Sequence, residues 1–268
     1  MKRKILSFLA AGMLFTLPAA AQSVGVVMSG GGAKGLYHIG VLQALEESGI
    51  PIDYVSGTSM GSIIAGMYAA GYSPEEMRRI VASGVVKQWV SGRIDPRYTP
   101  YYRQIGHNPA FLSVRMNVGG AGKRFRVTNL LSSTPIDMAL TELFAPATAA
   151  AEGDFDRLMV PFLCVSSDMN AREPVVMRNG DLSEAVRSSM SIPLVFKPMK
   201  KDSMLLYDGG IYDNFPWEPL DKEFHPDFLI GSKCTSGNND ITENSSLVDQ
   251  AFSLAMNKTN YDMPKGRS

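Results

Sequence analysis

Short apolar runs alternate with helical periodicity along the chain after its first 21 residues. Residues 24–28 form an apolar run that predicts a buried strand. From Leu36 to about Ser48 apolar side chains recur at helical spacing, and Gly49 ends this pattern. Residues 52–55 predict a second short strand and residues 63–70 a second helix. The order strand, helix, strand, helix predicts an α/β fold, with a parallel sheet and helices on its faces.

The same kind of pattern continues to about residue 234. Ser73, Pro74 and Glu76 form a capping pattern that predicts the start of a third helix. Further helices are predicted over residues 135–144 and 182–190, and further strands over residues 161–166, 204–207 and 228–234. Residues 89–111 have no clear period, so we expect a long loop or cover over the site there. Residues 111–118 and 123–127 predict two extended pieces.

The first 21 residues have the pattern of a secretory signal peptide. Lys2, Arg3 and Lys4 precede about 13 apolar residues, and Pro18 and three alanines then offer a cleavage site after Ala21. The apolar run is too short for a spanning helix, which needs about 20 residues. Because no Cys follows the run, a lipoprotein is disfavoured. We therefore expect export to the periplasm, to the outer membrane or cell surface, or to the medium.

Removal of this signal changes the charge of the chain. The whole sequence has 26 Lys and Arg against 26 Asp and Glu, and the signal holds three of the basic residues and no acidic one. The exported part therefore has 26 − 3 = 23 basic against 26 acidic residues. A mildly acidic domain lacks the basic face that duplex binding needs, so we expect no nucleic-acid partner.

The chain has two cysteines, Cys164 and Cys234, which exclude a disulfide-rich scaffold and a four-cysteine zinc site. Export would permit one bridge between them. Both lie in apolar, strand-like runs, where a buried free thiol is the commoner state.

A first glycine turn, residues 30–35, lies between a predicted strand and a predicted helix. Its glycines match the G-x-G-x-x-G pattern of dinucleotide-binding proteins, and Asp53 falls at the end of the next predicted strand. A P-loop is excluded because Leu36 stands where Lys and then Ser or Thr are needed. Free amides at a helix start bind anions in general, so this turn alone fits a pyrophosphate or a transient oxyanion.

A second glycine turn matches the G-x-S-x-G nucleophile elbow, in which a strained strand-to-helix turn exposes a serine hydroxyl. It is formed by Gly57, Thr58, Ser59, Met60 and Gly61. A dinucleotide-binding enzyme has no use for an exposed serine at this point. With Ser59 as nucleophile, the amides of the first turn would instead form an oxyanion hole. The two turns together favour a serine hydrolase over a nucleotide-binding protein.

A serine nucleophile needs a base, and the sequence offers two candidates. Asp208 followed by His225 has the chain order of α/β-hydrolases with a Ser-His-Asp triad. That fold, however, has its glycine-rich oxyanion segment on a later loop and not after the first strand. The alternative is a Ser–Asp dyad, because Asp208 follows an apolar strand and precedes Gly209 and Gly210, so its carboxylate would emerge at the strand end. An Asp-Gly turn without catalytic role is also common.

The motifs taken together resemble the patatin-like phospholipase family. They are residues 29–35 (SGGGAKG), 57–62 (GTSMGS) and 208–210 (DGG), with 188–193 (SSMSIP) and 214–216 (NFP), and the resemblance runs from Val24 to about Cys234. It implies a three-layer α/β/α domain with a mainly parallel central sheet. It also implies a catalytic dyad of Ser59 and Asp208 without metal or cofactor, and an oxyanion hole from Gly30, Gly31, Gly32, Ala33, Lys34 and Gly35.

The resemblance further implies a lipid acyl hydrolase of the phospholipase A, lysophospholipase or esterase type, which acts through an acyl-enzyme on a lipid or phospholipid at a membrane surface. Some exported bacterial proteins of this kind continue into a periplasmic module and an outer-membrane barrel. Residues 236–268 lack the repeated alternating strands of a barrel, so the chain either ends naturally or is the passenger part of a longer precursor.

These observations predict a simple domain organisation. Residues 1–21 are the signal peptide, and residues 22–236 form a single catalytic domain. Residues 237–268 are a polar segment, which is either the end of the domain or a linker. The composition, with 45% hydrophobic and 19% charged residues, is that of an ordinary globular chain and supports one domain of this size.

Overall fold

The structure is a computed structural model that describes residues 22–89, 132–193, 195–234 and 263. Several predicted segments lie outside these ranges: the signal peptide, all but the first residue of the loop or cover expected at 89–111, the extended pieces expected at 111–118 and 123–127, and the polar C-terminal segment except residue 263.

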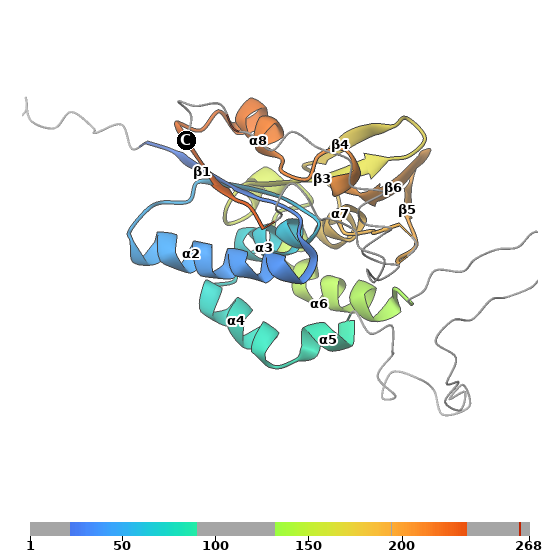
Figure 1. Cartoon of the computed structure of the whole chain (residues 1–268), viewed down its shortest axis with the longest axis horizontal. Helices are drawn as coiled ribbons and strands as arrows, with labels where there is room; N and C mark the ends of the chain where they lie inside the picture. The colour runs from blue at the N-terminus through green and yellow to red at the C-terminus, as the bar shows by residue number, and fades with distance from the viewer. Residues whose placement is uncertain (1–21, 90–131, 194, 235–262, 264–268) are drawn as a thin grey trace, which may run out of the picture.

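A mixed sheet, with seven strands in the described part of the chain, forms the centre of the domain (Figure 1). Four neighbouring strands are parallel, in the order β7 (Phe228–Ser232), β1 (Val24–Met28), β2 (Tyr54–Thr58) and β3 (Phe162–Asp168). The antiparallel strands are β4 (Glu173–Met177) and β6 (Met204–Asp208), which pair with β3, and β5 (Met199–Lys201), which pairs with β6. The expected α/β class with a largely parallel sheet is confirmed.

Helices cover both faces of the sheet, but one layer is much thicker. The thick layer and its edges contain α2 (Tyr37–Glu47), α3 (Met60–Ala69), α4 (Pro74–Ala82), α5 (Val85–Trp89), α6 (Thr134–Ala150) and α7 (Leu182–Ser189). In the described residues the other face carries α8 (Trp217–Phe224), seen alone above the sheet in Figure 1. The three expected layers are therefore present.

The two cores on either side of the sheet follow from alternation along β1. Val24, Val26 and Met28 pack into the large core with the helices of the thick layer, whereas Val27 packs on the other side with Leu220 of α8. All five residues of β1 are buried, as expected of a parallel strand that is covered on both faces.

The start of α4 shows how local sequence fixes one element. Glu76 N donates to Ser73 Oγ at 3.3 Å, and Ser73 N donates to the Glu76 carboxylate at 2.9 Å. This reciprocal capping box, with Pro74 in the first turn, confirms the predicted helix start.

Other element bounds were predicted less well. The strand expected at 52–55 is β2, Tyr54–Thr58, and it runs into the elbow because Gly57 and Thr58 pair with β3. The strands β4 and β5 and the helices α5 and α8 were not predicted. β4 contains Pro174 and is mostly exposed, so it lacks a clear apolar alternation. α8 has apolar residues at helical spacing, Trp217, Leu220 and Phe224, but it is eight residues long and contains Pro219.

Both cysteines are free thiols, Cys164 buried in β3 and Cys234 half-buried after β7.

No helix among the described residues is both long and apolar enough to cross a bilayer.

Candidate active site

Ser59 occupies the sharp turn between β2 and α3. Its backbone angles, φ 54° and ψ −121°, lie in a region that residues with a side chain rarely adopt, at a cost of about 1–3 kcal/mol. The first turn of α3 secures this conformation, because the Ser59 carbonyl accepts hydrogen bonds from Ser62 N at 3.0 Å and from Ser62 Oγ at 2.6 Å. The structure therefore has the strained elbow that the G-x-S-x-G pattern predicts, but Ser59 is 3% exposed and not the exposed serine that the pattern led us to expect.

The two glycines of the elbow are needed because backbone segments meet there. A Cβ atom on Gly57 would lie 2.4 Å from the carbonyl of Gly61. A Cβ atom on Gly61 would lie 2.3 Å from the carbonyl oxygen of Met28 at the end of β1. The absence of both side chains lets α3 start directly against the sheet, with Ser59 at the carboxyl ends of β1 and β2.

Strand pairing brings Asp208 to the same place from the opposite direction. On one edge of β3, β4 pairs with residues 164–168. The other edge is shared, since β2 pairs as far as Val165 and β6 pairs from Ser166 onward. β2 is parallel and β6 antiparallel to β3, so the two strands end head to head, at Thr58 and at Asp208. Thr58 and Asp208 thus lie opposite adjacent residues of β3, Val165 and Ser166, and Ser59 directly follows Thr58.

The two side chains form a direct hydrogen bond. Ser59 Oγ donates to Asp208 Oδ2 at 2.7 Å, and Gly210 N donates to Asp208 Oδ1 at 2.9 Å. Asp208 is fully buried and Ser59 nearly so. Burial raises the pKa of Asp208 to about 7, although the hydrogen bonds from Ser59 and Gly210 act against this shift. A carboxylate with such a pKa is a competent general base near neutral pH.

Gly209 packs as closely as the elbow glycines. A Cβ atom there would lie 2.1 Å from the carbonyl oxygen of Val165 and 2.9 Å from the Thr58 methyl group. The Asp-Gly-Gly motif therefore packs directly against the last residue of β2. Gly209 allows this close packing, and Gly210 donates its amide hydrogen to the Asp208 carboxylate.

Sequence reasoning missed two serines that hold the backbone of the dyad. Ser189 Oγ accepts from Ser59 N at 3.1 Å and donates to Val165 O at 2.6 Å. The Ser191 carbonyl accepts from Asp208 N at 2.9 Å. Both belong to the 188–193 motif that contributed to the resemblance, but nothing in their local sequence indicates their distant partners.

The glycine turn at residues 30–35 forms a short 3₁₀-helix, Gly32–Leu36, after β1. Gly30 N donates to Asn214 O at 3.1 Å and Lys34 N donates to Gly31 O at 3.2 Å, so these two amides are already used. The first-turn amides that point out of such a helix are those of Gly31, Gly32 and Ala33. Lys34 is exposed, and Gly35 is buried against Met60. The amides of Gly30 and Lys34 are thus engaged within the fold, and those of Gly31, Gly32 and Ala33 stay candidate donors.

The glycine turn depends on glycine for its conformation and for its approach to Ser59. Gly32 has a φ of +54°, which favours glycine. A Cβ atom on Gly30 would lie 3.1 Å from Ser59 Cβ, so the turn passes directly beside Ser59. The amides and the serine hydroxyl can therefore act on one carbonyl group.

The structure does not bring His225 to Ser59. His225 is exposed at the end of α8, three residues before β7, and β7 begins beside Val24. It thus lies at the amino-terminal edge of the parallel strands, whereas Ser59 follows the carboxyl-terminal edge. The Ser-His-Asp alternative with His225 is therefore wrong on geometric grounds.

The dinucleotide interpretation fails for a similar reason. Asp53 precedes β2 instead of ending it, and it accepts a hydrogen bond from Val24 N at 2.7 Å. It therefore lies at the opposite edge of the sheet from the glycine turn, too far to bind a ribose next to a pyrophosphate on that turn.

His38 has a structural environment that the sequence did not reveal. One ring nitrogen lies 2.7 Å from Ser232 Oγ and the other 2.8 Å from Ser29 O, and burial lowers the pKa of His38. The ring thereby joins the ends of β1 and β7 beneath the glycine turn. Within the described residues there is no group of three or more His, Cys, Asp or Glu side chains that could hold a metal ion.

A model of the family described as patatin-like phospholipase matches residues 26–221, which include the elbow, the glycine turn and the Asp-Gly-Gly motif. The chain belongs to this family. The match covers most of the chain, and the resemblance seen in the sequence is thus confirmed.

Individual relatives of the patatin-like chain are much longer proteins. The chain is 31% identical over 197 residues to a patatin-like phospholipase domain-containing protein of Caenorhabditis elegans, and the match covers 73% of this chain and 12% of the relative. It is 32% identical over 209 residues to a lysophospholipase of Cryptococcus neoformans, covering 78% of this chain and 11% of the relative. The chain thus spans about an eighth or less of the length of these curated relatives. Among solved structures, VipD from Legionella pneumophila is similar over 78% of this chain and 49% of its own, with 18% identity and a TM-score of 0.44.

Proposed function

We propose that the protein is a serine acyl hydrolase that cleaves carboxylic esters of lipids through a dyad of Ser59 and Asp208. The observation that carries this proposal is the 2.7 Å hydrogen bond from Ser59 Oγ to Asp208 Oδ2 on a strained elbow. A strained, buried serine paired with a buried carboxylate has no evident role in stability. Such a pair is typical of an activated nucleophile.

In the acylation step, Ser59 Oγ attacks the ester carbonyl carbon while its proton passes to Asp208. The amides of Gly31, Gly32 and Ala33 stabilise the negative charge that develops on the carbonyl oxygen. The tetrahedral intermediate then expels the alcohol, which takes the proton from Asp208, and an acyl-Ser59 ester remains.

In the deacylation step, a water molecule attacks this ester. Asp208 accepts a proton from the water, and Ser59 recovers a proton as the fatty acid leaves. The dyad is thus restored without a metal or cofactor. The hydrogen bond between Ser59 Oγ and Asp208 Oδ2 supports the proton transfer in both steps.

The proposal is tested with a short-chain chromogenic ester and with a phosphonate that labels reactive serines. Ser59→Ala and Asp208→Asn should each abolish hydrolysis, and Ser59→Ala should also abolish labelling. His225→Ala serves as the control and should retain activity, because His225 lies at the other edge of the sheet. Wild-type rates in Ser59→Ala would refute the proposal.

The first lipids to test are phospholipids and lysophospholipids. One relative bears the name lysophospholipase and the family is described as patatin-like phospholipase, so we propose lipid acyl esters at a membrane surface as the substrate class. A panel of diacyl, monoacyl and neutral lipids, each measured with the Ser59→Ala control, would determine the head-group and acyl-chain preference.

We also propose that the protein is exported, because residues 1–21 have the three parts of a signal peptide. Hydrolysis would then take place outside the cytoplasm. The proposal includes the case in which this chain is the passenger part of a longer precursor that carries a secretion module.

A further inference from the structure

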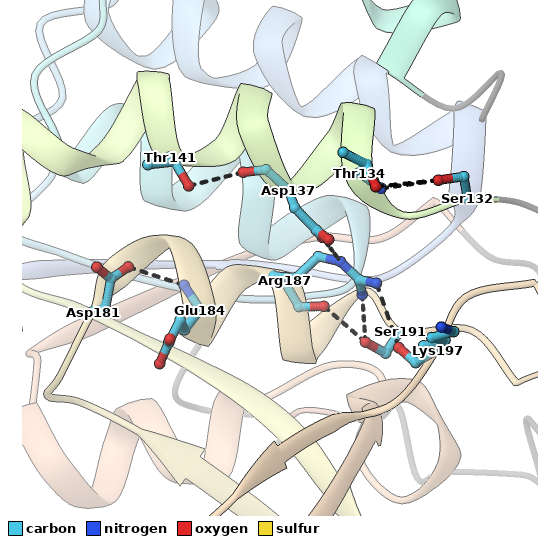
Figure 2. A network of polar contacts seen from close by, with 9 residues as sticks. All are labelled: Ser132, Thr134, Asp137, Thr141, Asp181, Glu184, Arg187, Ser191 and Lys197. Carbon is cyan, nitrogen blue, oxygen red and sulfur yellow. Dashed lines mark hydrogen bonds and ion pairs between the residues drawn. The ribbon is translucent and has the colours of Figure 1, made fainter. Parts of the chain in front are cut away.

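Arg187, near the end of α7, is a buried cation with partners in three separate segments (Figure 2). Its Nε donates to Asp137 Oδ1 of α6 at 2.5 Å, its Nη1 to Ser191 Oγ at 2.6 Å and its Nη2 to Lys197 O at 3.4 Å. Its Cζ lies 5.1 Å from the centre of the Phe196 ring. The guanidinium therefore connects α6, the turn after α7 and the chain that leads into β5.

Stability alone is a weak reason for this arrangement. The Arg187 side chain is 4% exposed, whereas that of its one acidic partner, Asp137, is 44% exposed. Buried ion pairs lose much of their attraction to desolvation, and well-packed apolar residues often stabilise such a position equally well. What an apolar residue could not do is fix three polar groups in one geometry, which the planar guanidinium does.

The contact with Ser191 links Arg187 to the catalytic base. Ser191 Oγ accepts from Arg187 Nη1 and donates to Arg187 O at 2.9 Å, so the hydroxyl is held at both ends. The carbonyl of the same residue accepts from Asp208 N at 2.9 Å. Asp208 is the last residue of β6, and its amide is bound by this carbonyl, which belongs to no strand.

The nucleophile is held by the same turn. Ser189 Oγ accepts the amide hydrogen of Ser59, and Ser189 stands two residues before Ser191. The turn at residues 188–191 thus touches the backbone of both members of the dyad. A shift of this turn would therefore act on the backbone of both residues at once.

We propose that Arg187 is a positioning residue, which holds the turn at residues 188–191 so that Ser59 and Asp208 stay within hydrogen-bond distance. The inference rests on the proposed hydrolase function and adds the residue that aligns its dyad. It acts through Ser191 and does not itself touch the reacting atoms. Misplacement of a reacting group by about 1 Å can cost ~10²-fold in rate.

The decisive variant is Arg187→Lys, measured with a soluble ester. Lysine keeps the positive charge but cannot contact Asp137, Ser191 and Lys197 together. We expect a ~10–10²-fold lower kcat with KM changed less than about twofold, since the binding surface stays and the alignment is lost. The rate of phosphonate labelling at Ser59, followed by intact mass, should fall by the same factor.

The chain offers a matched control in Arg178→Lys. Arg178 also pairs with carboxylates, Asp156 and Glu223 at 2.6 Å each, and also lies over an aromatic ring, that of Phe224. It follows β4 at the end of the sheet away from the dyad. This variant should keep the wild-type kcat.

Should Arg187→Lys fail to fold, Asp137→Asn tests the same link from a more exposed position, and its kcat should fall in the same direction. A folded variant of either kind with the wild-type kcat and labelling rate, whatever its melting temperature, would overturn the inference. Ser59→Ala, assayed in parallel, separates the two claims. Activity that depends on Ser59 but not on Arg187 refutes the positioning role alone, and activity that survives Ser59→Ala refutes the hydrolase.

Discussion

At the scale of single residues, Asp208 is a buried acid with a raised pKa. Its carboxyl group is fully buried and accepts hydrogen bonds from Ser59 Oγ and Gly210 N. Burial disfavours the ionised form, and the two hydrogen bonds only partly offset this, so its pKa is about 7. The same shift has one effect on catalysis and another on folding.

The catalytic effect is a pH dependence of the reaction. Asp208 accepts a proton only when it is ionised, so kcat/KM should rise with pH, with a midpoint near 7, and be lost at lower pH. The measurement is a pH profile with an ester that does not ionise. Asp213→Asn is the matched control, because burial also raises the pKa of Asp213, to about 6. A midpoint that moves in the Asp213 variant would exclude Asp208 as the titrating base.

The effect on folding has the opposite direction. Between the ordinary pKa of 3.8 and the folded value of about 7, the folded state binds more protons than the unfolded state, so stability falls as pH rises. Asp208→Asn removes this loss and should be more stable than wild type at pH 8, by at most ~4 kcal/mol. The difference should vanish near pH 4.

Chemical unfolding of both proteins at pH 4 and pH 8 measures this difference. Asp227→Asn is a control of opposite sign, because hydrogen bonds from Ser23 lower the pKa of Asp227. That variant should not gain stability at pH 8. An Asp208→Asn protein that is less stable than wild type at pH 8 would contradict the expected effect of burial.

At the scale of elements, glycines decide how closely the strands and helices of the site approach each other. A Cβ atom on Gly61 would lie 2.3 Å from the carbonyl oxygen of Met28, so α3 can start this close to β1 only with glycine at this position. Gly61→Ala should therefore separate α3 from β1, lower the melting temperature and reduce activity. Gly40→Ala is the control within α2, where an added Cβ meets nothing within 4 Å, and should raise stability by about 0.5–1 kcal/mol. Thermal melts of the two variants give the comparison.

Elements that depend on local chemistry were the ones predicted well. The start of α4 follows from Ser73, Pro74 and Glu76 alone, and the structure confirms it. β2 was placed two to three residues too early because its last residues, Ser56 to Thr58, are small and polar. They are buried because β1 and β3 pair with them on both sides, which a single segment cannot indicate.

At the scale of the whole molecule, sequence motifs were enough to name Ser59 and Asp208 as the proposed dyad. The motifs alone did not show that the two side chains contact each other. Ser59 and Asp208 are 149 positions apart, and only the shared edge of β3 brings their strands end to end. The supporting contacts of Ser189, Ser191 and Arg187 are of the same kind, since their partners lie on distant segments. The local sequence marks these residues as an ordinary helix end.

The proposed export concerns residues 1–21 and has its own test. If residues 1–21 are a signal peptide, the protein recovered from its native source should begin at Gln22. Intact-mass measurement determines this, and protease shaving of whole cells determines the side of the membrane. A chain that still begins at Met1 would refute export by this signal.

The head-to-head ends of β2 and β6 also have a consequence for the newly made chain. During synthesis the nucleophile emerges well before the base, and every segment up to the end of β5 can be complete while the hydroxyl of Ser59 still lacks its carboxylate. The pair of Ser59 and Asp208 therefore forms only after β6 has been made and has paired with β3. The order of the strands along the chain delays the assembly of the proposed dyad until most of the domain has been synthesised.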